Sequence, residues 1–420
     1  MKLYFDTNMR KINSSNENMV IYYSSFLHNS IEVNYDAAKV IDYIIKNGYG
    51  NELDIPNLLE ELPDFDETDI KDTYDALVES DLFFNDSVKY RSRKFLYKLY
   101  DSESDFKLER VYIHLTYRCN LKCEYCYNKE KLNSMEHLEI SEWEKVLNCL
   151  CDAGKPILTI TGGEAILYPY FNQFIEMAHD LGFYIELLTN GTLLNTLDVK
   201  IIKQINLFII SMDSLEKADS QRFNSEKYNV LENILYIKGL CKETYVRSVW
   251  TSQNKKEVFE LREYLKNQGI KHMISHFIPS KLSELPCCPD LCSLDNIEGS
   301  DIEVISRCGA CFRILAINPM GKIYPCQSLM HEEFLLSDIS SQNWLEEVKK
   351  SDITRYFKYR SIEDIEGCKE CSVKTVCGGG CKAISYNLYG DLEHKLDYLC
   401  EFFLRDSDSQ IKNISFEENE

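Results

Sequence analysis

The sequence predicts an α/β protein, preceded by a smaller α+β part and followed by a cysteine-rich part. From residue 108 to residue 277, short apolar runs rich in β-branched residues alternate with amphipathic stretches. Alternation of strands with helices indicates a parallel sheet. Residues 1–85 follow a different order of elements, and many of the cysteines gather into two arrays, one near residue 120 and one beyond residue 300.

The central part carries the signals of a repeated strand–helix unit. Strands are expected at residues 110–116, 157–161, 184–189, 205–211, 245–251 and 271–277. Helices are expected between them, at residues 141–152, 170–181, 198–203, 226–240 and 255–268. Folds of this class place their chemistry on the loops that leave the carboxyl ends of the strands, so those loops hold the candidate site residues.

Three cysteines, Cys119, Cys123 and Cys126, lie on the loop that leaves the first predicted strand. Iron–sulfur clusters are normally held by four thiolates, so a cubane held by three has one iron open to another ligand. Half of a zinc site and buried structural thiols are the alternatives. The C-x3-C-x2-C spacing, with the aromatic Tyr125 just before the last cysteine, resembles the signature of the radical S-adenosylmethionine (radical SAM) family.

The turns that end the next three predicted strands resemble the SAM-binding elements of the same family. Singly, each is an ordinary turn signal, but three in order behind the cysteines favour a binding site. The resemblance implies that Glu164, after a glycine pair that lets backbone approach a ligand, accepts the methionine ammonium of SAM. With Tyr125 from the cysteine loop, the expected SAM-site residues are Gly162, Gly163, Glu164, Asn190, Ser211 and Asp213. The strand–helix units, residues 110–280, resemble the partial (β/α)6 barrel of the family.

The C-terminal part, residues 281–420, carries the second cysteine array. Its members are Cys308, Cys311, Cys326, Cys368, Cys371, Cys377, Cys381 and Cys400. Their spacing resembles the SPASM domain, an extension of radical SAM peptide-modifying enzymes that carries two auxiliary iron–sulfur clusters. The resemblance implies that the ligands interleave. The nearer cluster takes Cys311, Cys326 and Cys381, and the farther one takes Cys400 and the three cysteines within 368–377.

The sequence leaves the ligand set of the nearer cluster open. Cys308 competes with Cys311 for the first position or binds beside it. Further candidates to replace Cys308 lie just upstream and are Cys287, Cys288 and Cys292. A zinc ribbon is the alternative for the C-x2-C pair that begins at Cys368, because this spacing is the commonest zinc half-site.

The N-terminal part, residues 1–85, predicts a small domain of strands and helices, and a charged linker is expected at 86–109. Two β-like runs, at 3–5 and 19–26, precede a helix whose apolar residues from Ala37 to Ile45 are three and four positions apart. A short helix near Leu58, a turn at Pro63 and a third helix from Ile70 to Val78 follow. This order resembles the winged-helix peptide-recognition element of enzymes that mature ribosomally made peptides, where a leader adds as a strand to an exposed edge.

Two other interpretations of the N-terminal part are a helical adaptor and a DNA-binding winged helix. Its stretch from Glu60 to Asp69 is acidic, which a phosphate backbone would repel, so peptide recognition is favoured. The net charge of −21 for the 420 residues also argues against nucleic acid and against an anionic membrane surface. Without an apolar run of about 20 residues or a signal-peptide core, the chain is expected in the cytoplasm. In that reducing compartment, clustered thiols among the 17 cysteines indicate metal ligands rather than disulfides.

The resemblance implies three [4Fe–4S] clusters and SAM as cofactors, with a 5′-deoxyadenosyl radical that takes a hydrogen atom from an unactivated carbon. The expected function is a maturase that installs a crosslink in a ribosomally made precursor peptide, as a cysteine thioether or a carbon–carbon bond. A formylglycine-generating sulfatase-type maturase and a non-catalytic iron–sulfur regulatory protein are the alternatives. The expected partners are the precursor peptide and an electron donor such as flavodoxin or ferredoxin.

Overall fold

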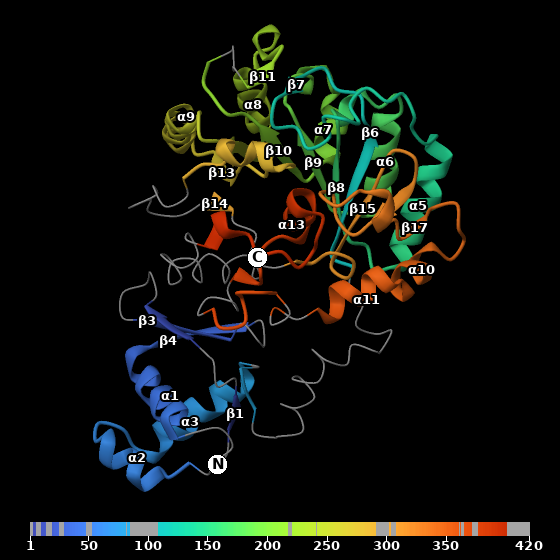
Figure 1. The fold of residues 1–420 in the computed structure, drawn as a ribbon. Coiled ribbons are helices and arrows are strands. Elements are labelled where there is room, and N and C mark those ends of the chain that lie inside the picture. Colours follow the sequence, from blue (N-terminus) through green and yellow to red (C-terminus); the bar gives the residue numbers. More distant parts are fainter. Residues whose placement is uncertain are drawn as a thin grey trace. The chain divides into compact units, whose positions relative to one another are not determined.

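The computed structural model of the chain is drawn in Figure 1. It describes residues 3–5, 10–13, 19–24, 29–47, 53–80, 82–84, 108–216, 221–240, 242–290, 302–303, 308–360, 362, 365–371 and 377–400. Nearly all of the predicted linker, and also Cys241 and Cys292, lie outside these residues. The chain divides into two compact units, a smaller one of residues 1–102, 367–379 and 397–420 and a larger one of residues 103–366 and 380–396. Each is described by itself.

The larger unit contains a sheet that is ten-stranded over the described residues, and its middle is the predicted parallel sheet. The parallel neighbours, in spatial and chain order, are β6 (Arg110–Thr116), β8 (Ile157–Gly162), β9 (Ile185–Thr189), β10 (Leu207–Ser211), β12 (Glu243–Trp250) and β13 (Lys271–His276). The α/β prediction is confirmed, and each observed strand lies within two residues of its predicted limits.

The predicted helices of the larger unit are also present. They are α5 (Ile140–Asp152), α6 (Phe171–Asp180), α7 (Val199–Gln204), α8 (Val230–Gly239) and α9 (Lys255–Asn267). Helix α8 begins four residues later than predicted, because Asn224 adopts a left-handed backbone with φ of 74° and a short 3-10 turn follows it. Asn229 then caps α8, since its side chain accepts from the amide of Glu232 at 3.4 Å.

The apolar core lies between this sheet and its helices. Val111, Ile113 and Leu115 alternate along one face of β6 and are fully buried. They belong to the same core as Trp143 of α5 and Phe174 of α6, whose rings meet edge to face at 5.6 Å. The helices thus fix the strands from one face, which leaves the carboxyl ends of the strands to carry the site.

Residues of the C-terminal part extend the sheet at both edges, which the sequence did not predict. Strand β15 (Ile314–Ile317) pairs in parallel with β6, and β16 (Lys322–Tyr324) and β17 (Ser337–Asp338) follow in antiparallel order. At the other edge, β14 (Ile302–Glu303) pairs with β13. The remaining helices of the larger unit are α10 (Trp344–Lys350), α11 (Asp352–Tyr359) and α13 (Lys382–Tyr389).

The turn from β15 to β16 explains the glycine inside the second cysteine array. Gly321 has a φ of 80°, and a Cβ there would lie 2.5 Å from the side chain of Ile339, so glycine is required. The reversal brings the two ends of the hairpin together, because the amide of Cys311 donates to the carbonyl of Pro325 at 3.2 Å. Cys311 is therefore placed beside the segment that carries Cys326.

The N-terminal part of the smaller unit contains the three predicted helices, α1 (Tyr35–Asn47), α2 (Ile55–Glu61) and α3 (Glu67–Glu79). Its two predicted β-runs are β1 (Tyr4–Phe5), which pairs with β5 (Phe83–Phe84), and β3 (Met19–Ser24). Strand β3 is the middle of an antiparallel sheet between β2 (Arg10–Asn13) and β4 (Asn29–Asn34), two polar strands without a strong sequence signal. None of the described helices has the length and apolar composition that crossing a bilayer requires.

Candidate active site

The loop after β6 gathers the thiols of Cys119, Cys123 and Cys126. All three are half-buried, and a tight turn joins two of them through the amide of Cys126, which donates to the carbonyl of Cys123 at 3.3 Å. Burial raises the pKa of Cys123 to about 12, and the neighbouring thiols of Cys126 and Cys119 add to this by repulsion. Thiols that repel one another when ionised need a bound cation to stay ionised together, which an iron–sulfur cluster supplies.

A buried arginine lies beside this loop. Within the short β7 (Lys122–Cys123), Cys123 pairs with Arg222 of β11 (Arg222–Phe223), and the positive charge of Arg222 lowers the pKa of Cys123. The donor set therefore fits an anionic thiolate-bound cluster. Among the described residues, no three His, Cys, Asp or Glu side chains converge tightly enough for a single metal ion. A cubane instead spreads its thiolates over several corners, so its ligands do not need to converge on one point.

The glycine pair after β8 is held against the cysteine loop. A Cβ on Gly162 would lie 2.2 Å from the carbonyl oxygen of Thr116, and one on Gly163 would lie 2.3 Å from that of Arg118. The amide of Gly163 donates to Thr116 and that of Glu164 donates to Arg118, each at 2.8 Å. The glycines thus allow the ends of β6 and β8 to touch, which places Glu164 next to the cysteine loop.

Glu164 is fully buried and receives three donors. The hydroxyl of Thr189 lies 2.9 Å from both carboxylate oxygens, the amide of Asn190 donates at 2.8 Å and the amide of Ile166 at 3.2 Å. Burial raises the pKa of Glu164, and these hydrogen bonds oppose the rise. A carboxylate has about four acceptor positions, so one position is left for a further donor such as an ammonium.

Asn190 connects the end of β9 to the cysteine loop. Its side-chain amide lies 3.9 Å from the sulfur of Cys119 and donates to the side chain of Asn120 at 2.9 Å. Its side-chain oxygen accepts from the amide of Thr192 at 3.0 Å, which fixes the direction of the donor. A donor aimed at a cysteine sulfur would stabilise the thiolate form.

Asp213, after the end of β10, forms the centre of a buried polar group. Its carboxylate accepts from the hydroxyl of Tyr125 and from the amide of Val249 at 2.8 Å, and it lies 3.7 Å from Arg222. Ser211, Asp213 and Arg222 line a cavity of about 290 Å³. The sequence reasoning missed Arg222, because nothing local to a lone arginine after a turn-rich stretch indicates that it reaches the cysteine loop.

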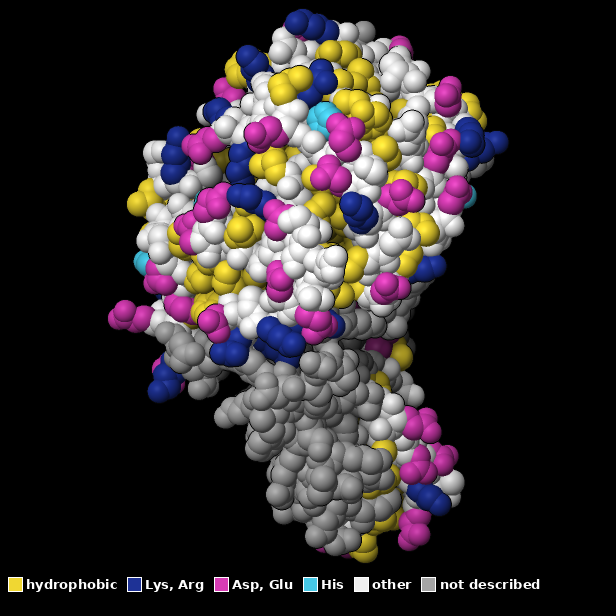
Figure 2. All heavy atoms as spheres, turned by 90° about the vertical axis from the view of Figure 1, so that its right-hand side faces the viewer, with side chains coloured by type: hydrophobic (Ala, Val, Ile, Leu, Met, Phe, Trp, Pro, Cys, Tyr) yellow, Lys and Arg dark blue, Asp and Glu magenta, His cyan; other side chains and the backbone are white. Residues whose placement is uncertain are grey.

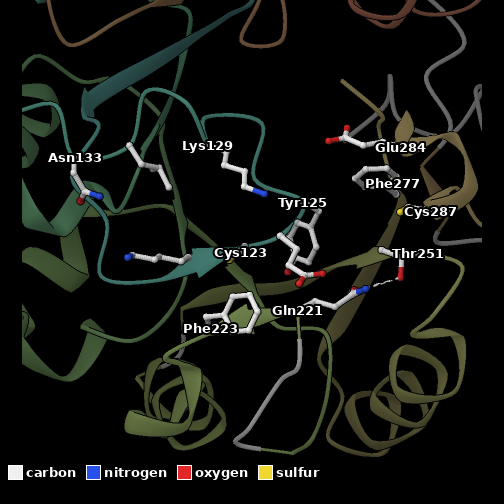
Figure 3. Close-up of a pocket in the computed structure, with 13 residues that line it drawn as sticks. Cys123, Tyr125, Lys129, Asn133, Gln221, Phe223, Thr251, Phe277, Glu284 and Cys287 are labelled. Carbon is white, nitrogen blue, oxygen red and sulfur yellow. Dashed lines mark hydrogen bonds between the residues drawn. The ribbon is translucent and has the colours of Figure 1, made fainter. Parts of the chain in front are cut away.

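A larger cavity of about 520 Å³ also borders the cysteine loop. Figure 3 shows Lys129, Tyr125 and Phe223 around it, with Asn133 and Cys287 at opposite ends. The side chain of Gln221 donates to the hydroxyl of Thr251 at 3.2 Å within its wall. Cys287, a candidate to replace Cys308 as a cluster ligand, thus lies in this cavity, which Cys123 also lines.

The cysteines of the second array fall into two groups, one in each unit. Four lie in the larger unit: Cys308, Cys311, Cys326 and Cys381. Burial raises the pKa of Cys326, and the thiols of Cys308 and Cys381 raise it further; the pKa of Cys311 is raised by burial and then by Cys308 and Cys326. These four are therefore close neighbours. The other four, assigned to the farther cluster, all belong to the smaller unit: Cys368, Cys371, Cys377 and Cys400.

The comparisons with known proteins agree with this geometry. The model of the radical SAM superfamily matches residues 113–279, from β6 to just beyond β13. The chain contains a radical SAM domain. Proteins with this domain use SAM and a [4Fe–4S] cluster, and the cysteine loop, Glu164 and Asp213 all lie at the carboxyl edge of the matched sheet.

The similarity to curated proteins extends beyond residues 113–279. The antilisterial bacteriocin subtilosin biosynthesis protein AlbA of Bacillus subtilis is 24% identical over 293 residues. The match covers 63% of this chain and 65% of AlbA, so the chain spans less than two thirds of that relative.

Two solved structures share the fold. Streptococcus suis SuiB bound to its precursor peptide SuiA has a TM-score of 0.58 at 14% identity, covering 95% of this chain and all of SuiB. The anSMEcpe structure with bound AdoMet and the Cp18Cys peptide has a TM-score of 0.56 at 18% identity, covering 73% of this chain and 98% of that one. These likenesses confirm the predicted fold class, a radical SAM α/β sheet with a cysteine-rich C-terminal part.

Proposed function

We propose that the chain is a radical SAM maturase that crosslinks a ribosomally made precursor peptide. The observation that carries the proposal is the convergence of Cys119, Cys123 and Cys126 with buried Glu164 and Asp213 at one edge of the sheet. With SAM and a cluster bound there, the site would supply a 5′-deoxyadenosyl radical. A thioether from a cysteine sulfur is the first product we expect, and a carbon–carbon bond is the second.

The residues of the chain have separate tasks in this proposal. Glu164 offers its remaining acceptor position to the methionine ammonium of SAM, while the Ser211 and Asp213 side of the smaller cavity holds the ribose and methionine. Arg222 places a buried positive charge beside Cys123 and Asp213, where it offsets the negative charge of bound thiolates. The larger cavity, which also borders Cys123 and Tyr125, then receives the residue to be modified.

The peptide substrate is proposed from the kind of relatives the chain has. AlbA acts in subtilosin biosynthesis, and SuiB is seen with a precursor peptide. Figure 2 shows that acidic and basic side chains are interspersed over one face of the larger unit, a surface that suits a protein or peptide partner better than nucleic acid.

The N-terminal part is proposed to bind the leader segment of the precursor. Its sheet β2–β3–β4 ends, among the described residues, in β2 on one side and β4 on the other, and a peptide strand can add to such an edge through main-chain hydrogen bonds. The fully buried Val20 and Tyr22 anchor β3 to α1, where Tyr22 donates to the carbonyl of Ala38 at 3.0 Å. A sheet held rigidly by its helix is a preorganised template for strand addition.

The second cysteine array is proposed to hold two auxiliary clusters, one on the four cysteines of each unit. Crosslinking removes two hydrogens from the peptide. One leaves as an atom to the 5′-deoxyadenosyl radical, and the other leaves as a proton and an electron, for which these clusters offer a path. A flavodoxin or ferredoxin in the cytoplasm would supply the electron that cleaves SAM.

The test of this function is turnover of a cysteine-bearing peptide encoded beside the chain. Reduced, anaerobically reconstituted protein with SAM should form 5′-deoxyadenosine and a peptide lighter by two hydrogens whose cysteine no longer reacts with an alkylating reagent. A product that reacts with a hydrazide probe instead would indicate a formylglycine aldehyde and a sulfatase-type maturase. Absence of SAM cleavage by an iron-loaded, reduced protein would favour the non-catalytic alternative.

A further inference from the structure

A lysine is buried beside the four cysteines of the larger unit. Lys382 begins α13 directly after Cys381, and none of its surface is exposed. Its Nζ donates to the carboxylate of Glu393 at 3.3 Å, and the same carboxylate accepts the hydroxyl of Tyr356. Lysine is almost never fully buried unless it is paired, so the ammonium of Lys382 requires compensating negative charge nearby.

Glu393 does not balance the positive charge around Lys382 by itself. Arg360 is close enough to repel Lys382, so among the described residues two cations act against the carboxylate of Glu393. The thiol of Cys308 is also close enough to act on Lys382. Further negative charge at Cys308 and its neighbours would complete the balance, and thiolates bound to a cluster provide it.

The helix that Lys382 begins also starts at a member of the same group. Cys381 is the N-cap of α13, and burial and the thiol of Cys308 raise its pKa while the backbone of Ile384 and Ala383 lowers it. The N-terminus of a helix carries a partial positive charge that favours an anion. Cys311, another member of the group, is fully buried. The site therefore combines a buried cation, a helix N-terminus and exclusion of solvent.

We propose that Lys382 is a charge-compensating residue that raises the reduction potential of a cluster held by Cys308, Cys311, Cys326 and Cys381. Cluster potentials depend on net charge, on hydrogen bonds to the sulfurs and on solvent exposure. A reduced cluster carries one more negative charge than the oxidised one, so a fixed cation stabilises the reduced form more. That the cluster beside Lys382 accepts the electron released by the peptide is a further part of the proposal, and this part rests on the proposed crosslinking.

The test is a redox titration of full-length, reconstituted protein, followed by electron paramagnetic resonance. A background with Cys119, Cys123 and Cys126 replaced by alanine removes the SAM-site cluster and simplifies the spectrum. Lys382→Met should lower the midpoint potential of one cluster by at least about 59 mV, which is a tenfold change in the equilibrium constant of a one-electron reduction. Lys382→Arg should keep the potential, and Lys350→Met, at an exposed lysine of α10, should leave both clusters unchanged.

Glu393→Gln should change the midpoint potential in the direction opposite to Lys382→Met. Removing the carboxylate leaves the charge of Lys382 uncompensated, so the potential of the same cluster should rise. A purely structural role for Lys382 predicts no such reversal. Unchanged potentials in Lys382→Met with full iron content would overturn the proposal, and so would the absence of a cluster on Cys308, Cys311, Cys326 and Cys381. If Lys382→Met fails to bind iron, the Glu393→Gln variant provides the test. A midpoint potential of the cluster that is unchanged or lower in Glu393→Gln than in the wild type would then overturn the proposal.

The titration contains neither peptide nor SAM, so its outcome is separate from that of the proposed function. If the midpoint potential does not change when Lys382 is replaced, the proposal of peptide crosslinking is unaffected. A potential that responds to Lys382, in a protein that turns over no peptide, removes the crosslinking proposal and keeps the redox role of this residue.

Discussion

The hydroxyl of Tyr125 donates a hydrogen bond to the carboxylate of Asp213, 88 positions away in the chain. This bond joins the cysteine loop after β6 to the end of β10, on the far side of β8 and β9 in the sheet. The sequence marked both residues for contacts with SAM, and the structure adds a direct contact between them. Their pairing means that the cysteine loop and the Asp213 side of the smaller cavity are positioned together.

Replacing Tyr125 by phenylalanine tests this link. The ring remains, but buried Asp213 loses one of its donors, which should lower the free energy of unfolding by about 1–3 kcal/mol. Urea denaturation of the anaerobic, reconstituted protein measures the change. Tyr236→Phe is the matched control, because Tyr236 lies on α8 with 41% of its surface exposed and should cost nothing measurable. Equal stability of the two variants would contradict a structural link through the hydroxyl.

Glu164→Gln should weaken SAM binding while the cysteine loop keeps its cluster. Losing a charge-assisted hydrogen bond to the ammonium costs about 1.5–3 kcal/mol, which is roughly a 10- to 100-fold rise in the Kd for SAM. Equilibrium binding with radiolabelled SAM, with iron content measured in parallel, checks both parts. Glu176→Gln, on α6 in an exposed pair with Lys200, is the control. A wild-type Kd in Glu164→Gln would remove the ammonium role.

The pH dependence of SAM binding follows from the same carboxyl group. Burial raises the pKa of Glu164, so in the folded protein this group takes up its proton at a higher pH than an exposed glutamate does. The ammonium of SAM requires the carboxylate form. SAM affinity should therefore fall as the pH is lowered through this raised pKa and be constant above it, and Glu164→Gln should show no such fall. A fall of equal size in the variant would assign the titration to another group.

Iron content separates the candidate ligands of the nearer auxiliary cluster. Three cubane clusters correspond to about twelve irons per chain. Replacing Cys308 and Cys311 together by alanine should remove about four, whereas replacing Cys287 and Cys288 together should remove none, since Cys287 lines the larger cavity instead. Retention of about twelve irons by the first double variant, or zinc in place of iron in the wild type, would contradict the auxiliary-cluster assignment.

Deleting residues 1–100 should separate SAM chemistry from peptide recognition. The radical SAM domain lies wholly beyond this segment, so the truncated protein should still cleave SAM when reduced in the absence of peptide. Turnover of the full-length precursor should be lost, because strand addition to the N-terminal sheet supplies affinity for the leader. Adding the N-terminal domain as a separate chain should restore part of it. Unchanged precursor turnover after truncation would move the leader site elsewhere.

The sequence predicted the central sheet well, because β8, β9 and β10 are largely apolar runs that end in turns, and buried residues alternate along β12 and β13. It missed β15, β16 and β17 as strands of the same sheet, since the pairing of β15 with β6 joins segments about 200 residues apart and has no local signal. The sequence also did not predict the polar strands β2 and β4, for a related reason. Their pairing with β3, and not their own composition, makes them strands.

The candidate site shows the same limit. Cysteine spacing and strand-end turns marked the cysteine loop, Glu164 and Asp213, yet Arg222 is defined only by its pairing with Cys123 across β7 and β11. Spacing alone also left Cys308 and the upstream cysteines as rivals. The structure favours Cys308 over Cys287, because Cys308 lies beside Cys326 and Cys381 while Cys287 lines the larger cavity. The burial of Lys382 beside these cysteines likewise could not be predicted from the sequence, because it depends on the tertiary structure.

We propose that Cys119, Cys123 and Cys126 hold the cluster that cleaves SAM. A variant with all three cysteines replaced by alanine, reconstituted and reduced beside the wild type, tests this through the formation of 5′-deoxyadenosine. We expect the variant to form no 5′-deoxyadenosine while it keeps about eight irons on the auxiliary sites. Continued SAM cleavage by that variant on reduction would show that other residues hold the catalytic cluster.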